Sequence, residues 1–489
     1  MSQKVDKNTA VKNSIWKLLE SFLSKGISMV VSIILARILM PEDYGVIALT
    51  TVFINLTDIL IQAGFSTALI SKETVNEDDY STVLGISIIS AIILYCILFV
   101  CSPFIAEVYD TPVLVPVLRV ISLALFLQAF AAVRTAVVSR NMQFKVLFFC
   151  TLISNFVSGI MGIAAAFCGL GVWALVLQQL SQQFLLTVTL FITVKMKIKF
   201  RISRQSVREI APFSFKVLTS SLLSFAGDSL YSVAIGKFYS LKDLGYYDKG
   251  GQFPRQFSLY TFSAVSNVFL PVFASYKEDY PRLNEIFRRV VNVSCYIIFP
   301  LMAGICVAAK PFISLLLTDK WLPCVEILRW FCLYYAATPI LLANVQLHFA
   351  IGKGNTRIKT ETMRIILMVV MFIIFITVKA SIVIIAAGLS VIQVIISAVI
   401  TVETQRATGY IIRNSVTDAL PTIASVIIMC IGIYAVSLTG IYNNFILFVL
   451  EVIMGASIYL LSSVILRNRA LQEVLDMMKL LISKKGKKV

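Results

Sequence analysis

The chain has 489 residues, of which 58% are hydrophobic and 14% are charged, with a mean hydropathy of +0.87 and a net charge of +17. A soluble protein of this length cannot bury so much apolar surface, so the composition predicts an integral membrane protein. Nine cysteines without CxxC spacing and a single histidine, His348, exclude a disulfide framework, a zinc site and a histidine proton relay, and basic residues spread over many short stretches exclude a nucleic-acid-binding protein.

Long apolar segments follow one another along the whole chain. A membrane-spanning helix needs about 20 mainly apolar residues, and this criterion predicts about fourteen spans. The spans of the first half start near Ser14, Tyr44, Tyr80, Pro112, Phe144 and Val172. Those of the second half start near Ala211, Leu244, Leu283, Trp321, Ile358, Ser381, Ala419 and Phe445. We therefore expect an all-α integral membrane protein, without a cleavable signal because the first apolar run is too long for one.

Basic residues set the expected orientation of these spans. They are concentrated in residues 1–17, in the connection 195–208 and in the tail after residue 466. With the amino terminus inside, about 31 basic residues lie on the cytoplasmic side and about 6 outside, which is the distribution typical of inner-membrane proteins. Both termini are therefore expected in the cytoplasm.

The two halves of the sequence resemble each other. At an offset of about 200 positions, RILMPEDYG (37–45) aligns with KFYSLKDLG (237–245), and Arg119 and Arg329 match at a slightly larger offset. Polar residues at helical spacing recur as well, because Ser21, Ser24 and Ser28 correspond to Ser221, Ser224 and Asp228. An even number of spans separates the copies, which predicts parallel repeats with a binding site between them.

This repeat predicts the domain organisation. We expect an amino-terminal lobe at 1–195, a basic cytoplasmic linker at 196–209 and a carboxy-terminal lobe at 210–404. Two additional spans at 405–466 and a basic cytoplasmic tail at 467–489 have no counterpart in the first half. Two similar lobes that rock about a central site would give alternating access, which favours a transporter over an enzyme.

Charged and polar residues inside the spans are the candidate site. The substrate-binding candidates are Lys25, Arg255, Arg119, Arg329 and Lys249, and the cavity-lining candidates are Ser21, Ser24, Ser28, Ser221, Ser224 and Asn55. Asp58 and Asp228 are candidates for coupling to a proton or sodium ion. Three structural alternatives remain open: the serines allow close helix packing, Arg119 and Arg329 extend toward the membrane surface, and an ion pair forms inside each lobe. No catalytic residue, metal site or nucleotide-binding motif is expected.

Several segments resemble those of Wzx-type polysaccharide flippases, in the multidrug/oligosaccharidyl-lipid/polysaccharide superfamily. The resemblance is carried by LARILMPEDYGVIALTTVFINLTDILIQAGFSTALISKE (35–73), GKFYSLKDLGYYDKGGQFPRQF (236–257) and KPFISLLLTDKW (310–321). It points to the subgroup that serves colanic-acid and teichuronic-acid type polymers. It implies a two-lobed, fourteen-helix flippase that moves undecaprenyl-pyrophosphate-linked oligosaccharides outward, with Lys25 and Arg255 in a cationic cavity.

Two alternative functions remain open. A cation-coupled multidrug exporter of the same superfamily would carry mostly cationic cargo, which an excess of basic residues disfavours. A polysaccharide polymerase or glycosyltransferase would need a larger outer loop for its active site. The expected partners are the lipid-linked oligosaccharide, membrane lipids, and the polymerase and glycosyltransferases of one pathway. The sugar composition, coupling ion and oligomeric state are not encoded in a recognisable motif.

Overall fold

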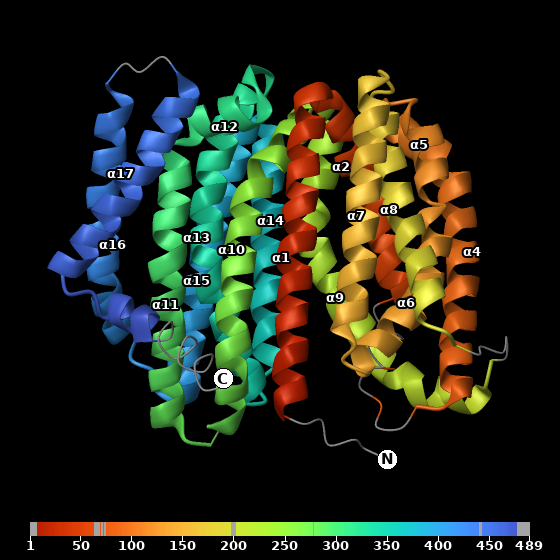
Figure 1. Ribbon diagram of the computed structural model, residues 1–489, viewed down its shortest axis with the longest axis horizontal. Helices are drawn as coiled ribbons and strands as arrows, with labels where there is room; N and C mark the ends of the chain where they lie inside the picture. Colours follow the sequence, from red (N-terminus) through yellow and green to blue (C-terminus); the bar gives the residue numbers. More distant parts are fainter. Residues whose placement is uncertain are drawn as a thin grey trace. The chain divides into compact units, whose positions relative to one another are not determined.

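Helices make up the fold. The computed structural model describes residues 7–62, 69, 72, 75–196, 202–276, 278–439 and 443–476, and this part of the chain contains helices and no strand (Figure 1). Within it, eleven helices are long and apolar enough to cross a membrane, or up to twelve if a bent helix, α9 (Arg204–Phe238), counts as one span. The expected all-α fold is confirmed, and the chain is a multi-pass membrane protein. The number of fourteen spans stays a prediction.

Each predicted span start lies in or directly beside a helix, including Pro112, which precedes α5, and Ser381, the N-cap of α15. Residues 1–6, 197–201 and 477–489, which hold much of the basic charge used to orient the chain, lie outside the described residues. The cytoplasmic location of both termini therefore remains a prediction.

The chain divides into two compact units, Met1–Gly245 and Tyr246–Val489. The helices of the first unit are α1 (Lys7–Ile38), α2 (Pro41–Gln62), α4 (Glu77–Val108), α5 (Leu114–Ile121), α6 (Ala124–Arg140), α7 (Phe144–Phe167), α8 (Val172–Thr193), α9, and the first turn of α10 (Leu241–Ser275). Those of the second unit are the rest of α10, α11 (Tyr280–Val307), α12 (Ala309–Leu317), η1 (Asp319–Cys324), α13 (Val325–Ala350), α14 (Asn355–Thr377), α15 (Ile382–Thr408), α16 (Ile412–Ser437) and α17 (Asn444–Ile465). The division falls in α10, after α9, whereas the lobes predicted from the repeat meet at the 196–209 linker; the lobe boundaries stay a prediction.

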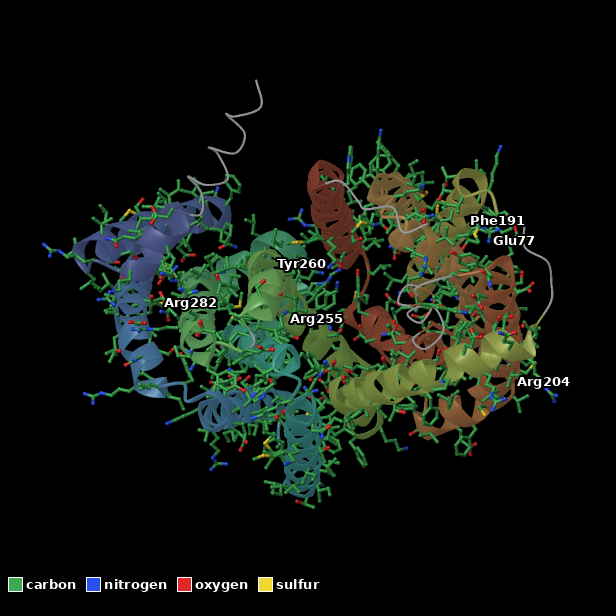
Figure 2. The ribbon with its side chains drawn as sticks, turned by 90° about the horizontal axis from the view of Figure 1, so that it is seen from below. Glu77, Phe191, Arg204, Arg255, Tyr260 and Arg282 are labelled. Atoms are coloured by element: carbon green, nitrogen blue, oxygen red, sulfur yellow. The ribbon has the colours of Figure 1, made fainter. Side chains whose placement is uncertain are left out.

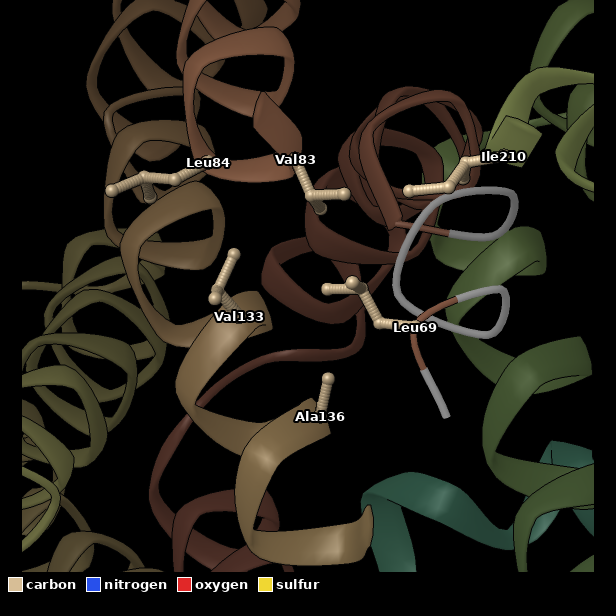
Figure 3. Packing of buried hydrophobic residues seen from close by; sticks show 6 residues of the cluster. All are labelled: Leu69, Val83, Leu84, Val133, Ala136 and Ile210. Atoms are coloured by element: carbon tan, nitrogen blue, oxygen red, sulfur yellow. The ribbon is translucent and has the colours of Figure 1, made fainter. Parts of the chain in front are cut away.

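The amino-terminal part of α9 packs into the first unit. Ile210 joins a buried apolar cluster with residues of α4 and α6, among them Val83, Leu84 and Val133 (Figure 3). Just before α9, the backbone amide of Ser203 donates to Thr82 Oγ1 at 2.9 Å. These contacts explain why the helix that follows the linker clusters with the half that precedes it.

The repeated segments have the same local structure. Asp43 Oδ2 accepts a hydrogen bond from the Met40 amide at 3.0 Å, and Asp243 Oδ2 accepts one from the Ser240 amide at 3.3 Å. An acidic side chain in the first turn satisfies an amide that the helix leaves unpaired and complements the helix dipole. The sequence match between the two halves therefore corresponds to two helices, α2 and α10, that begin in the same way.

Two glycines bring the first turns of α2 and α10 into contact. A Cβ atom on Gly45 would lie 1.9 Å from the Leu241 carbonyl oxygen, and one on Gly245 would lie 2.1 Å from the Pro41 carbonyl oxygen. Each glycine thus faces the backbone at the start of the other helix. Because the obstructing atoms are backbone, a larger side chain at either position requires the two helix ends to separate.

In the second unit, α16 and α17 pack against each other and against α11. Their buried core includes Tyr296, Met429, Ile433 and Tyr459. Beyond one end of this core, Arg288 of α11 forms a bidentate ion pair with Asp418 of α16, with 2.7 Å between Nη2 and Oδ1. The two helices that the predicted repeat leaves without a counterpart therefore share an apolar core with α11, and an ion pair also joins α16 to α11.

Candidate functional site

Ser24 and Ser28 of α1 line a pocket inside the first unit, together with Lys25. The pocket has a volume of about 230 Å³, and its other walls are residues of α7 and α8, including Asn155 and Gln182. Ser24 Oγ donates to Thr151 Oγ1 at 3.0 Å, Asn155 Nδ2 donates to the Ser24 carbonyl at 3.2 Å, and Gln182 Nε2 donates to Asn155 Oδ1 at 2.6 Å. A hydrogen-bonded chain of polar side chains therefore runs from α1 through α7 to α8.

The same face of α1 packs closely on α7. Ser24 is buried, and a Cβ atom on Gly159 of α7 would lie 2.4 Å from Val31 Cγ2. The sequence left two explanations for the serines of α1: they line a cavity, or their small size lets two transmembrane helices pack closely. The contacts of Ser24 fit this packing explanation, while the exposed side chain of Lys25 lies beside the pocket. The side chain of Ser21 lies outside the described residues.

The other polar candidates of the first unit lie elsewhere. On α2, Asn55 is exposed and Asp58 is half-buried. On α9, Ser221 and Ser224 are half-buried and Asp228 is exposed. None of these five residues lines the pocket around Lys25. Their assignment to a cavity or to ion coupling stays a prediction.

The two arginines matched in the sequence, Arg119 and Arg329, have partners within their own units: Arg119 contacts α4, and Arg329 contacts Glu326 of its own helix and α11. Arg119 Nε donates to Ser102 Oγ at 3.0 Å, and its guanidinium lies 4.2 Å from the centre of the Phe99 ring. Arg329 Nη1 donates to Glu326 Oε1 at 2.6 Å, and Nε donates to the Cys306 carbonyl at 3.3 Å. These partners give both side chains a structural role, and Arg329 additionally faces a pocket.

α10 carries the two remaining basic candidates. Lys249 is 2% exposed, and its ammonium donates to Gln252 Oε1 at 2.8 Å. It also lies within electrostatic reach of Asp248 and Arg255. Arg255 is exposed and projects from the same helix as Tyr260 (Figure 2). α10 thus presents one buried and one accessible cation within two turns, which suits the recognition of an anionic group.

The second unit contains a larger pocket that the sequence did not predict. It has a volume of about 780 Å³ and lies between α11–α13 and the α16–α17 pair. Its polar lining includes Lys310, Ser314, Asp319, Arg329 and Glu451. Glu451 is an isolated acidic residue in an otherwise apolar helix, and this contrast was the available sequence signal.

Two buried arginines were also missed. Arg134 of α6 is 4% exposed and lies 3.4 Å from the centre of the Phe191 ring, and Phe191 is marked in Figure 2. Arg364 of α14 is 6% exposed, pairs with Glu361 and donates to Tyr334 Oη at 3.3 Å. Arg134 lies six residues before the end of α6, and Arg364 lies nine residues after the start of α14. Only the packing of neighbouring helices reveals that both are buried.

The chain is similar to membrane proteins of polysaccharide biosynthesis. It is 25% identical over 321 residues to the succinoglycan biosynthesis transport protein ExoT of Rhizobium meliloti (strain 1021), covering 66% of this chain and 65% of that protein. It is 23% identical over 497 residues to an uncharacterized membrane protein in the cps region of Klebsiella pneumoniae, covering 97% of this chain and 98% of that protein. The chain thus spans slightly less than two thirds of the Rhizobium protein and nearly all of the Klebsiella protein.

Solved structures share the fold. The lipid II flippase MurJ in an inward closed conformation superposes with a TM-score of 0.75 at 17% identity, covering 94% of this chain and 99% of that one. An inward-facing multidrug resistance MATE transporter superposes with a TM-score of 0.64 at 14% identity, covering 81% and 94%. At these identities the likeness establishes the fold and leaves cargo open.

The family assignment rests on the sequence. Residues 34–326 match the model of the family described as polysaccharide biosynthesis protein. This range contains the segments 35–73, 236–257 and 310–321 on which the resemblance was based, so the predicted resemblance is confirmed. By this match over more than half of its length, the chain belongs to the polysaccharide biosynthesis protein family.

Proposed function

We propose that the chain is a flippase that moves undecaprenyl-pyrophosphate-linked oligosaccharides from the cytoplasmic to the outer leaflet of the bacterial inner membrane. It works by alternating access, with both termini in the cytoplasm, and performs no covalent chemistry. The family match over residues 34–326 carries the proposal. The names of the relatives, which describe transport and polysaccharide biosynthesis, and the lipid II flippase among the structural neighbours support it.

Charge supports an anionic cargo. The basic residues at depth include Lys25, which lines a pocket, and Lys249 and Arg255, which lie on one helix. A cation in a membrane costs several kcal/mol by most estimates unless it faces water or a partner, and an anionic cargo group in an aqueous cavity would stabilise these residues. A pyrophosphate offers the oxygens that an ammonium and a planar guanidinium bind.

The test measures translocation in cells that depend on this chain. Arg255→Ala should abolish surface polymer and accumulate lipid-linked oligosaccharide in the inner leaflet, and Arg255→Lys should restore only part of the transport, because ammonium lacks the bidentate geometry of guanidinium. Arg282→Ala is the matched control, since Arg282 is an exposed arginine in the first turn of α11. Full transport by Arg255→Ala at a normal protein level would refute the role of Arg255.

A double substitution separates cargo binding from a structural ion pair. If Arg255 serves only to neutralise Asp248 or Asp228, removing the acid together with the arginine should restore transport, because no uncompensated charge remains. If Arg255 binds cargo, the double variant should stay inactive. The same cells test orientation: a cysteine introduced at Gln205 should react with a membrane-impermeant thiol reagent only after the cells are opened.

A multidrug exporter is the second candidate, because a MATE transporter shares the fold. Mostly cationic drugs would be repelled by Lys25, Lys249 and Arg255. Drug resistance conferred by the chain, with surface polymer unaffected by its deletion, would favour the exporter. The polymerase or glycosyltransferase alternative is disfavoured by the transport names of the relatives.

A further inference from the structure

Glu451 lies near the middle of α17, in a helix that otherwise carries no charged residue. Glu451 is only 1% exposed. In the described part of the chain, neither of its carboxyl oxygens has a hydrogen-bond partner. Buried polar groups are nearly always paired, so an orphaned carboxyl group requires an explanation.

The carboxyl group faces the pocket of about 780 Å³ in the second unit. One helical turn further along the same face of α17, the chain is tightly packed: a Cβ atom on Gly455 would lie 2.8 Å from Ile433 Cδ1 and 3.7 Å from Met429 Cγ. In Figure 1, α16 and α17 lie side by side at one edge of the second unit. The route from Glu451 to an aqueous phase therefore leads through the pocket, and the apolar packing at Gly455 closes this helix face one turn beyond the carboxyl group.

The other charged groups of the pocket have different partners. Arg329 donates to Glu326 and to the Cys306 carbonyl, and Asp319 accepts from Ser314, which in turn accepts from Asn444 at 3.1 Å. Lys310 is exposed, and within the described residues no basic side chain forms an ion pair with Glu451. The remaining titratable groups in the lining are the Cys306 thiol of α11 and the Tyr434 phenol of α16.

An isolated carboxylate is strongly disfavoured in an apolar environment, and it is neutralised either by a proton or by a bound cation. A metal cation needs several oxygen ligands, preferably more than one carboxylate. The described residues contain no group of three or more His, Cys, Asp or Glu side chains that could hold a metal ion. The other carboxylate in the pocket lining, Asp319, accepts a hydrogen bond from Ser314, so Glu451 is the one orphaned carboxyl group among the described lining residues, and a single carboxyl group suits a proton.

We infer that Glu451 is a proton-binding site that exchanges protons with the outside of the protein through the pocket lined by Lys310 and Arg329. The site is distinct from Asp58 and Asp228, the coupling candidates of the sequence. It lies in the helix pair α16–α17, which has no counterpart in the first half of the chain. The inference does not depend on which cargo the protein moves.

Infrared difference spectroscopy of the purified full chain in lipid nanodiscs tests this inference. A pH titration should show the C=O stretching band of a protonated carboxylic acid that disappears at alkaline pH. Glu451→Gln should remove this band, whereas Glu403→Gln should keep it, because Glu403 is a half-buried glutamate on α15 that pairs with Arg406. The titration should be the same in sodium and in potassium buffers.

Two results would overturn the inference: persistence of the acid band in Glu451→Gln, or a band that is lost when sodium is added at constant pH. Glu451→Gln is close in shape to the protonated side chain and should fold. Should it aggregate, Glu451→Asp provides the second measurement, since it must keep an acid band at a shifted frequency. An unshifted band in Glu451→Asp would assign the band to another residue and refute the site.

Discussion

Replacing Gly45 by alanine tests the contact between the first turns of α2 and α10. The added Cβ atom would lie 1.9 Å from the Leu241 carbonyl oxygen, whereas Cβ atoms in proteins stay at least 3.0 Å from other atoms. The two helix ends must therefore separate by at least 1.1 Å, the difference between these distances. The obstructing atom is backbone, so a side-chain rotation cannot relieve the clash. Overpacking of this kind costs about 1–3 kcal/mol.

For a unit of this size, a loss of that magnitude lowers the melting temperature by about 2–12 °C. The assay is thermal unfolding of the full chain in detergent, followed by circular dichroism. Gly245→Ala should have a similar but smaller effect, because its Cβ atom would lie 2.1 Å from the Pro41 carbonyl oxygen. Gly26→Ala is the matched control: nothing lies within 4 Å of its added Cβ atom, and alanine favours a helix by about 1 kcal/mol over glycine. The gain in helix propensity acts at both positions, so the clash is measured against Gly26→Ala. If Gly45→Ala melts at the same temperature as Gly26→Ala, the contact is not as close as described.

Two further predictions concern ion pairs. Asp418→Ala should lower the unfolding free energy by about 2–3 kcal/mol, because it leaves the partly buried guanidinium of Arg288 without its bidentate partner; chemical denaturation measures this, and an unchanged midpoint would contradict it. For Lys72, partial burial lowers the pKa, but its hydrogen bonds and attraction to the Asp79 and Glu209 carboxylates outweigh burial and raise the pKa above 10.5. The stability that Lys72 contributes should be fully present below pH 10.5 and be lost as the pH rises through the raised pKa. Lys72→Met should therefore be less stable than the unmodified chain at neutral pH. Between neutral and strongly alkaline pH it should lose less stability than the unmodified chain does.

Much of this protein was accessible from sequence because the relevant interactions are local. Apolar length and composition predicted membrane helices, since each spanning helix must satisfy its own backbone hydrogen bonds whatever its neighbours are. The repeat was visible for the same reason: Asp43 and Asp243 each bond to an amide three residues away. Family membership also follows from sequence, because the match over residues 34–326 compares residues and not shapes.

The tertiary structure decided which helix faces which neighbour. Helical spacing placed Ser24 on a polar stripe of α1, and only the packing of α7 shows that it bonds to Thr151 and is buried. The sequence likewise showed that Glu451 is charged, while its burial, missing partner and pocket depend on α11, α12 and α16. The spacing of residues in the sequence defines which face of a helix each one occupies. Whether that face is buried depends on the elements that pack against it. The close approach of Gly45 to Leu241 also depends on the tertiary structure, because the two residues are far apart in the sequence. A glycine is required at position 45 only because the backbone of another helix lies against it.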